Sequence, residues 1–273
     1  MNRACRLARM ALLIGSTAVR ISAAQSKPDA VAADPCQDIT AWLQAHPAGP
    51  ADFRDYGADL MRRGMTAAQA SARIKALQWE DCPSAIALAF DRIYRAEKLT
   101  FNPEPNAFLM ETVRGMTPGT ALDVAMGQGR NSIYLAKAGW RVTGFDVSGE
   151  GLAAARQAAE RAGLKIATVQ QGWQDFDFGT GRWDLIVLIY AWVPISDPAF
   201  VQRLCRSLRQ GGYVVYEGYR AGPSESSGIW PKANELTTLF ERDLRILRYE
   251  DVESLSDWRT QTKARVLRML ARK

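Results

Sequence analysis

Residues 121–148 have the sequence ALDVAMGQGRNSIYLAKAGWRVTGFDVS, and this stretch decides the expected fold. An apolar run at 121–125 is followed by the turn GQGR, by a segment of helical character that ends at Gly139, and by a second apolar run at 141–148. Parallel strands need a long crossover between them, usually a helix. The stretch therefore predicts two neighbouring parallel strands joined by a helix.

The same alternation continues toward the C-terminus. We expect helices at 151–163, 198–212 and 234–242, and strands at 166–171, 183–192 and 213–219. Apolar strands that alternate with helices are typical of an α/β fold, a Rossmann-like sheet covered by helices on both faces. Two further strands, at 244–252 and 264–272, are separated by a polar turn instead of a helix, which predicts a closing antiparallel hairpin.

The preceding third of the chain predicts a small helical N-terminal region at 36–99, with the sheet domain at 100–273. We expect helices at 36–45, 51–63, 66–80 and 84–98, the third capped by Thr66. The last of these helices has an apolar stripe that includes Phe90 and Tyr94. Such a stripe is typical of core packing, and lining of a binding site is the alternative.

The first 24 residues have the pattern of a signal peptide: arginines at positions 3, 6 and 9, an apolar run at 10–19, and small residues at 22–24. The alternative is a leader that stays on a cytoplasmic protein, and Arg20 is atypical of a cleaved signal. Residues 25–35 form a linker. We therefore expect an exported protein, periplasmic or extracellular, if the leader is cleaved, and a cytoplasmic one otherwise.

The cysteines bear on the same question. Cys36 and Cys82 lie at predicted helix starts in the small helical region. In an oxidising compartment they could form one disulfide, and two unrelated buried thiols are the alternative. Cys205 falls on the apolar side of a predicted helix, where a core position is expected.

Composition excludes several classes of protein. With 273 residues, 47% apolar and 23% charged, the chain is neither disordered nor a disulfide scaffold. The net charge of +6 is modest and spread over both halves, and no apolar run is long enough to span a bilayer. His46 is the single histidine, so a Ser-His-Asp hydrolase, a Cys-His protease or a multi-histidine metal site is excluded, and we expect no metal.

The chemistry is concentrated around the glycine turn. Asp123, Gly127 and Gly129 form the pattern D-x-x-x-G-x-G, and Asp146 ends the second strand. Glycines let the backbone approach a ligand closely, and a carboxylate after the second strand can accept hydrogen bonds from both hydroxyls of a ribose. Two sites fit: a dinucleotide site, with Ser132 in the third glycine position, or an S-adenosyl-L-methionine (AdoMet) site. The acidic Asp123 and the closing hairpin favour AdoMet.

At this point residues 100–273 resemble the class I AdoMet-dependent methyltransferases. The strings GQGRNSIYLAKAGWRVTGFD, LRQGGYVVYE and RVLRMLARK are similar to the tellurite-resistance-type methyltransferases. The resemblance implies a seven-stranded, mostly parallel sheet with a reversed C-terminal strand, and AdoMet as the cofactor. It also implies a cofactor site made of Asp123, Ala125, Gly127, Gly129, Arg130, Asn131, Asp146, Val147, and Gln174 or Asp175.

Within that site Asp146 would bind the ribose, Val147 the adenine, and the glycine turn the methionine end. The chain departs from the family pattern at Ala125, where relatives carry glycine, and at Gly172-Trp173, where relatives often carry an acid. A solvated turn residue is the alternative for Asp175.

Methyl transfer from a sulfonium is an in-line displacement that can rest on positioning and exclusion of water, without a proton shuttle. Tyr190 and Trp192 follow the fourth strand, where this family approaches the methyl group, and their rings can face a cation or an apolar acceptor; packing at the rim is the alternative. Tyr94, with Phe90, is expected as part of a lid. Arg259 could meet an anionic acceptor or simply be solvated.

We therefore expect a methyltransferase of a small-molecule acceptor, such as a thiol or a chalcogen oxyanion. A non-catalytic AdoMet- or nucleoside-binding module is the second hypothesis, and an NAD-dependent oxidoreductase the third. Nucleic acid is not expected as a partner, because no N/D-P-P-Y/F motif follows the fourth strand and no dense basic stripe is present. After removal of the leader we expect no membrane span, and the sequence does not indicate the oligomeric state.

Overall fold

A computed structural model describes residues 34–49, 54–77, 82–96, 102–222, 228–257 and 263–273. All of these belong to one compact unit, Asp34–Lys273. The predicted signal peptide, most of the linker, and Arg259 lie outside the described residues. None of the helices in the described ranges is both long enough and apolar enough to cross a membrane.

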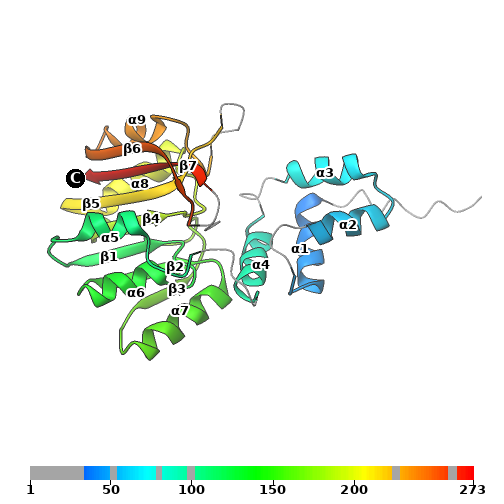
Figure 1. The fold of residues 1–273 in the computed structure, drawn as a ribbon, viewed down its shortest axis with the longest axis horizontal. Coiled ribbons are helices and arrows are strands. Elements are labelled where there is room, and N and C mark those ends of the chain that lie inside the picture. The colour runs from blue at the N-terminus through cyan, green and yellow to red at the C-terminus, as the bar shows by residue number, and fades with distance from the viewer. Residues whose placement is uncertain (1–33, 50–53, 78–81, 97–101, 223–227, 258–262) are drawn as a thin grey trace, which may run out of the picture. The chain divides into compact units, whose positions relative to one another are not determined.

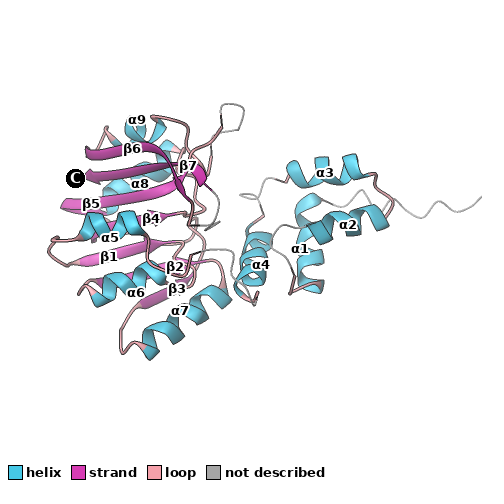
Figure 2. Ribbon diagram, viewed as in Figure 1, coloured by secondary structure: helices cyan, strands magenta, loops and turns pink. Residues whose placement is uncertain are grey.

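The centre of the structure is a seven-stranded sheet in the order β3-β2-β1-β4-β5-β7-β6 (Figures 1 and 2). Its strands are β1 (Thr120–Val124), β2 (Arg141–Asp146), β3 (Ala167–Gln170), β4 (Trp183–Ile189), β5 (Leu208–Tyr219), β6 (Arg245–Leu255) and β7 (Lys263–Arg272). The first five strands pair in parallel, and β7 pairs antiparallel with both β5 and β6. The Rossmann-like sheet with a reversed C-terminal strand is thereby confirmed.

Helices cover both faces of this sheet. The helices are α5 (Ala107–Val113), α6 (Arg130–Lys137), α7 (Gly149–Arg161), α8 (Pro198–Ser207) and α9 (Glu235–Phe240). Alternate residues of β4 pack on opposite faces of the sheet. Val187 packs in one core with α5 and α6, and Ile186 packs in the other with α8 and α9. Side chains point alternately to the two faces of a strand, which is why the apolar run at 185–189 is buried on both sides of the sheet.

The helix expected at 198–212 is shorter than predicted. It ends at Ser207, and Leu208 already has extended backbone and pairs with Trp183 of β4. The positive φ of 81° at Gly211 belongs to an irregular start of β5 rather than to the end of a helix. Pairing with a buried neighbour strand thus overrides the helical pattern of the sequence.

The small helical region consists of α1 (Pro35–Ala45), α2 (Arg54–Arg62), α3 (Ala67–Lys75) and α4 (Pro83–Tyr94). Thr66 caps α3 in a capping box with Gln69, as predicted. A disulfide joins Cys36 in α1 to Cys82, the residue that precedes α4, with their Cα atoms 5.4 Å apart. Of the two alternatives for these cysteines, the structure has the bond, and Cys205 is buried in the sheet domain.

Candidate cofactor and active site

Two buried carboxylates lie at the ends of β1 and β2. Asp146 closes β2, and its two oxygens accept hydrogen bonds from the backbone N–H groups of Gly127 and Ser148, both at 2.8 Å. Asp123 lies in β1 and accepts a hydrogen bond from the Ser132 hydroxyl at 2.6 Å. Because β1 and β2 are parallel neighbours, their carboxyl ends meet at the same edge of the sheet and bring both acids to the glycine turn.

Burial dominates the electrostatics of this pair. It raises the pKa of Asp123 to about 6, against a lowering contribution from the Ser132 hydrogen bond. It likewise raises the pKa of Asp146 to about 6, against the hydrogen bonds donated by Ser148 and Gly127. A buried carboxylate costs free energy unless groups around it share its charge, so an edge that holds two of them is suited to ligands that donate hydrogen bonds.

The turn between β1 and α6 has a left-handed backbone at three places. The φ angles are 54° at Ala125, 54° at Gly127 and 77° at Gly129. A Cβ at Gly129 would lie 2.8 Å from the Cβ of Ala155, so Gly129 is needed for the packing of α7 against the turn. Ala125 adopts a backbone that glycine adopts without strain, which explains why the family pattern has glycine there.

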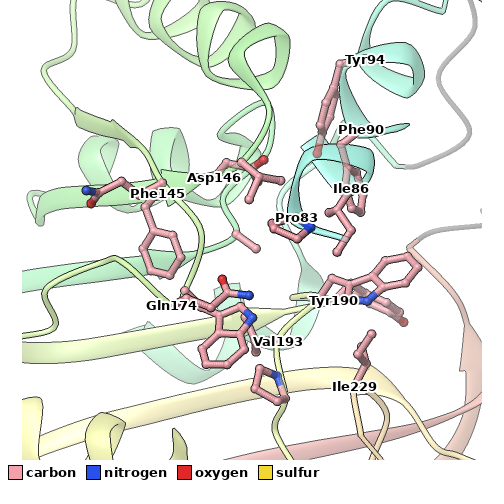
Figure 3. Close-up of a pocket in the computed structure, with 16 residues that line it drawn as sticks. Pro83, Ile86, Phe90, Tyr94, Phe145, Asp146, Gln174, Tyr190, Val193 and Ile229 are labelled. Atoms are coloured by element: carbon pink, nitrogen blue, oxygen red, sulfur yellow. The ribbon is translucent and has the colours of Figure 1, made fainter. Parts of the chain in front are cut away.

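Two adjoining cavities open at this edge. The first has Phe145, Asp146, Val147, Gln171, Trp173 and Gln174 on one side, with residues of α4 and of the segment after β4 on the other. In Figure 3, Ile86, Phe90 and Tyr94 project from α4 toward this cavity. The second cavity is more polar, and its lining includes Asp123, Gln128, Arg130, Asn131 and Asp257.

Tyr94, Ala125 and Tyr190 line both cavities and therefore lie at their junction. A Cβ at Gly127 would collide with the Tyr94 hydroxyl, and one at Gly151 would lie 2.9 Å from the Tyr94 ring, so this ring lies directly on the turn. Burial raises the pKa of Tyr94 well above its usual value, and the charge of Asp146 adds to the effect.

The free volumes of the two cavities are about 70 Å³ and about 60 Å³. Pockets that hold small ligands usually have roughly 300–1,000 Å³. The Tyr94 ring thus closes the junction, and a ligand that spans both cavities requires this ring to move.

Helix α4 is held to α7 by polar contacts beside Tyr94. Asp91 accepts hydrogen bonds from the Ser148 hydroxyl at 2.6 Å and from the Glu150 backbone N–H at 3.1 Å. Arg95 forms an ion pair with the Glu150 side chain at 2.8 Å. Because Ser148 also caps α7 and donates to Asp146, these contacts connect α4 directly to the second carboxylate.

The polar cavity is closed by a network that the sequence did not predict. Arg130 donates to the Glu104 carbonyl at 2.7 Å and forms an ion pair with Asp257 at 2.8 Å. Asn131 accepts a hydrogen bond from the backbone N–H of Asn106, whose side chain donates to Asp257. Asp257 follows β6, more than a hundred residues from the turn, so no local pattern in the sequence could have indicated it.

The segment after β4 is strained and aromatic. Tyr190 has a φ of 53°, rare for a large side chain, and is only 7% exposed. Such strain is concentrated at functional sites. Trp192 contacts Phe90 of α4 edge to face, with ring centroids 5.6 Å apart, and its buried indole Nε1 has no hydrogen-bond partner among the described residues.

The structure brings most of the predicted residues to the two cavities. The lining includes Tyr94, Asp123, Ala125, Arg130, Asn131, Asp146, Val147, Gln174, Tyr190 and Trp192. Gly127 and Gly129 shape the turn without lining either cavity. Of the pair Gln174 and Asp175, Gln174 lines the first cavity, while Asp175 is exposed and belongs to neither lining.

Several lining residues were missed. Gln171 and Trp173 follow β3 at the same sheet edge, and the rule that strand ends meet there would have found them. Among the described residues no three His, Cys, Asp or Glu side chains gather as they would around a metal ion.

The residues present fit an adenosyl cofactor. Asp146 keeps unshared oxygen lone pairs beside the two backbone hydrogen bonds it accepts, as a ribose site needs. Val147 and Phe145 supply apolar surface next to Gln171 and Gln174, whose amides can bond an adenine edge. The glycine turn has the cradle that a Cβ would fill, since Tyr94 already lies against Gly127.

Comparison with known proteins supports the same identification. Residues 121–212 match a family described as methyltransferase domain. A ubiquinone biosynthesis O-methyltransferase from Sodalis glossinidius is 30% identical over 124 residues, which are 45% of this chain and 50% of that protein. The chain thus spans about half the length of the curated relatives it matches.

Solved structures share the fold. TehB from Haemophilus influenzae aligns with a TM-score of 0.52 and 22% identity over 62% of each chain. A structure from work on the conversion of a disulfide bond into a thioacetal group during echinomycin biosynthesis aligns with a TM-score of 0.55 and 20% identity, over 69% of this chain and 91% of that one. These two structures show the fold alone, while residues 121–212 match the methyltransferase domain family, so this part of the chain is a methyltransferase domain with the sheet order of the class I AdoMet-dependent enzymes.

Proposed function

We propose that this protein transfers the methyl group of AdoMet to a small-molecule acceptor, with a thiol or a chalcogen oxyanion as the acceptor group. The observation that carries the proposal is the junction of the two cavities at Tyr94, Ala125 and Tyr190. A cofactor with its adenosine end at Asp146 and its methionine end at Asp123 would have its sulfonium at that junction.

When bound there, AdoMet supplies an electrophilic methyl group on a positively charged sulfur. The chain's own contribution is binding and positioning. Asp146 would accept hydrogen bonds from the ribose. The Asp123–Ser132 and Arg130–Asp257 pairs would surround the methionine end, and Tyr190 would limit the direction from which an acceptor approaches. The Tyr190 ring would stabilise the charge of a sulfonium beside it, and exclusion of water would strengthen that attraction.

The experiment is calorimetry followed by turnover. We expect binding of AdoMet and S-adenosylhomocysteine but not of NAD, and release of S-adenosylhomocysteine in the presence of candidate thiols or oxyanions. Binding of NAD in place of AdoMet would support an oxidoreductase. Binding of AdoMet with no turnover on any acceptor would support a non-catalytic binding module, since a fold alone does not establish an activity.

We also propose that the protein works in an oxidising compartment after removal of residues 1–24. The disulfide between Cys36 and Cys82 supports this, because such bonds persist mainly in exported proteins. Mass spectrometry of protein from the native host tests it: the mature chain should begin near residue 25 and gain two hydrogens on reduction. A full-length chain with both thiols free would contradict the proposal.

A further inference from the structure

The side of the first cavity that faces away from the cofactor residues is an apolar, aromatic wall. It is formed by Pro83, Ile86 and Phe90 of α4, and by Trp192 and Ile229. Phe90 and Trp192 meet edge to face at 5.6 Å, and both side chains line the cavity. A flat apolar molecule packs well against rings in this arrangement.

The charge of the cavity points to an uncharged ligand. Among the described residues that line the cavity, Asp146 is the only one with a carboxylate or a basic side chain, and its charge is negative. An anion that entered would lose its hydration, gain no cationic partner from these residues, and approach a carboxylate. An oxyanion is therefore the less suitable of the two acceptor classes.

The lining of this cavity also indicates which nucleophile can react there. None of its described members is histidine, lysine or cysteine, and both oxygens of Asp146 already accept backbone hydrogen bonds. A phenol, with a pKa of about 10, would need a base here, whereas a thiol loses its proton more readily, with a pKa of about 8.5 in cysteine and less in aromatic thiols. Sulfur also contacts aromatic rings favourably. The indole Nε1 of Trp192, which has no partner among the described residues, can donate a hydrogen bond to the acceptor sulfur.

We propose that the acceptor is an uncharged, flat apolar thiol that binds between the Ile86–Phe90 face of α4 and Trp192. This rests on the proposed function and narrows its substrate class. In the transfer, the acceptor sulfur forms a bond to the methyl carbon as the bond from that carbon to the cofactor sulfur breaks. The electron pair of the broken bond stays on the cofactor, which leaves as S-adenosylhomocysteine, and the thiol proton goes to water. Ile86 and Phe90 are assigned as specificity-determining residues.

The test uses benzenethiol as the probe, with para-mercaptobenzoate as a charged analogue of the same ring and thiol, and selenite as an oxyanion. Binding of each to the protein saturated with S-adenosylhomocysteine is measured by calorimetry at about pH 5.5, where the thiol of benzenethiol is protonated and the carboxylate of the analogue is charged. Methyl transfer is measured by release of S-adenosylhomocysteine from AdoMet. We expect benzenethiol to bind at least about tenfold more tightly than para-mercaptobenzoate, a difference of about 1.4 kcal/mol, and selenite not to compete with it.

Two variants locate the preference. Ile86→Lys places a cation in the wall and should reverse or abolish the preference for the uncharged thiol. Phe90→Ala should weaken benzenethiol binding severalfold, since it removes one ring of the pair. Met61→Lys is the matched control, because Met61 is 45% exposed on α2 and lines neither cavity, and it should leave the preference as it is.

Equal or better binding of para-mercaptobenzoate or selenite would overturn the inference, as would an unchanged preference in Ile86→Lys. Failure of benzenethiol to bind would overturn it as well. If AdoMet binds in the same samples, only this inference fails; if AdoMet does not bind, the proposed function fails with it.

Discussion

The helical region at 34–96 and the sheet domain at 102–273 maintain their structure by different means. The sheet domain has large apolar cores on both faces of seven strands. The helical region has one small core around Trp42, Tyr56 and Leu60, and a disulfide that links two of its helices. Small units bury too little surface to be stable alone and are often cross-linked for that reason. The comparison teaches that α4, which lines the candidate site, is supported from both regions: by the disulfide to α1 on one side and by the contacts of Asp91 and Arg95 with α7 on the other.

The largest expected effect separates the two regions directly. Cys36→Ser removes a cross-link across 46 residues, which the chain-entropy model values at about 4 kcal/mol. We expect amide hydrogen exchange to accelerate strongly in α1–α4 and to change little in the sheet strands. Reduction of the unmodified protein with dithiothreitol should have the same effect, and Cys36→Ser itself should not respond to reductant. Uniform acceleration over the whole chain would show that the two regions unfold as one.

The second prediction concerns pH, because buried acids in the two regions respond in opposite directions. Asp123 and Asp146 have a pKa raised by burial to about 6, so the stability they contribute is complete below about 3.8 and is lost as pH rises through 6. Burial alone would raise the pKa of Asp38 in α1 too, but hydrogen bonds from Arg63 and Tyr56 lower it. Its contribution is present above 3.8 and is lost as pH falls through its lower value.

When the pH is lowered from 7 to 5, the sheet strands should therefore gain stability, on the order of 2 kcal/mol for the two carboxyls together. The stability of α1–α3 should change little. Hydrogen exchange at both pH values measures each region separately. Asp123→Asn and Asp146→Asn should each remove about half of the pH dependence of the strands, and persistence of the full dependence in both variants would refute this account.

The third prediction tests the cofactor site of the sheet domain. Asp146→Ala should weaken AdoMet binding by more than about tenfold, or 1.4 kcal/mol, because the ribose loses its acceptor and the Gly127 and Ser148 amides lose theirs. Calorimetry measures this. Asp175→Ala is the matched control: its side chain is exposed and outside both cavities, so AdoMet affinity should stay within about twofold. Unchanged affinity in Asp146→Ala would count against the whole site.

The smallest expected effect probes the junction between the two regions. Tyr94→Ala removes the ring that lies on the glycine turn, so AdoMet should associate faster and bind a few fold more tightly, a change of about 1 kcal/mol or less. Stopped-flow fluorescence gives the association rate. Weaker binding would show instead that Tyr94 packs on the bound cofactor and belongs to its site.

The two regions also differ in how far the sequence predicted them. The positions of the strands and the antiparallel closing hairpin could be anticipated because apolar strands and polar turns are local signals, and Asp123 and Asp146 followed from their places at strand ends. The Asp257–Arg130 pair and the contact of Phe90 with Trp192 could not, since they join segments far apart in the chain. Nor could the sequence decide whether Cys36 and Cys82 pair, because pairing depends on how α1 and α4 pack.

The position of β7 between β5 and β6 has a consequence for how the chain acquires its structure during synthesis. Glu217 in β5 is only 2% exposed, and its partners are Asn106, which precedes it, and Arg268, which lies in β7. While residues beyond β6 are still on the ribosome, β6 has no neighbour in the sheet and Glu217 lacks its guanidinium. A buried carboxylate without its counter-charge is strongly destabilising. In the nascent chain the edge of β5 should therefore stay unpaired and accessible to chaperones until Arg268 has emerged.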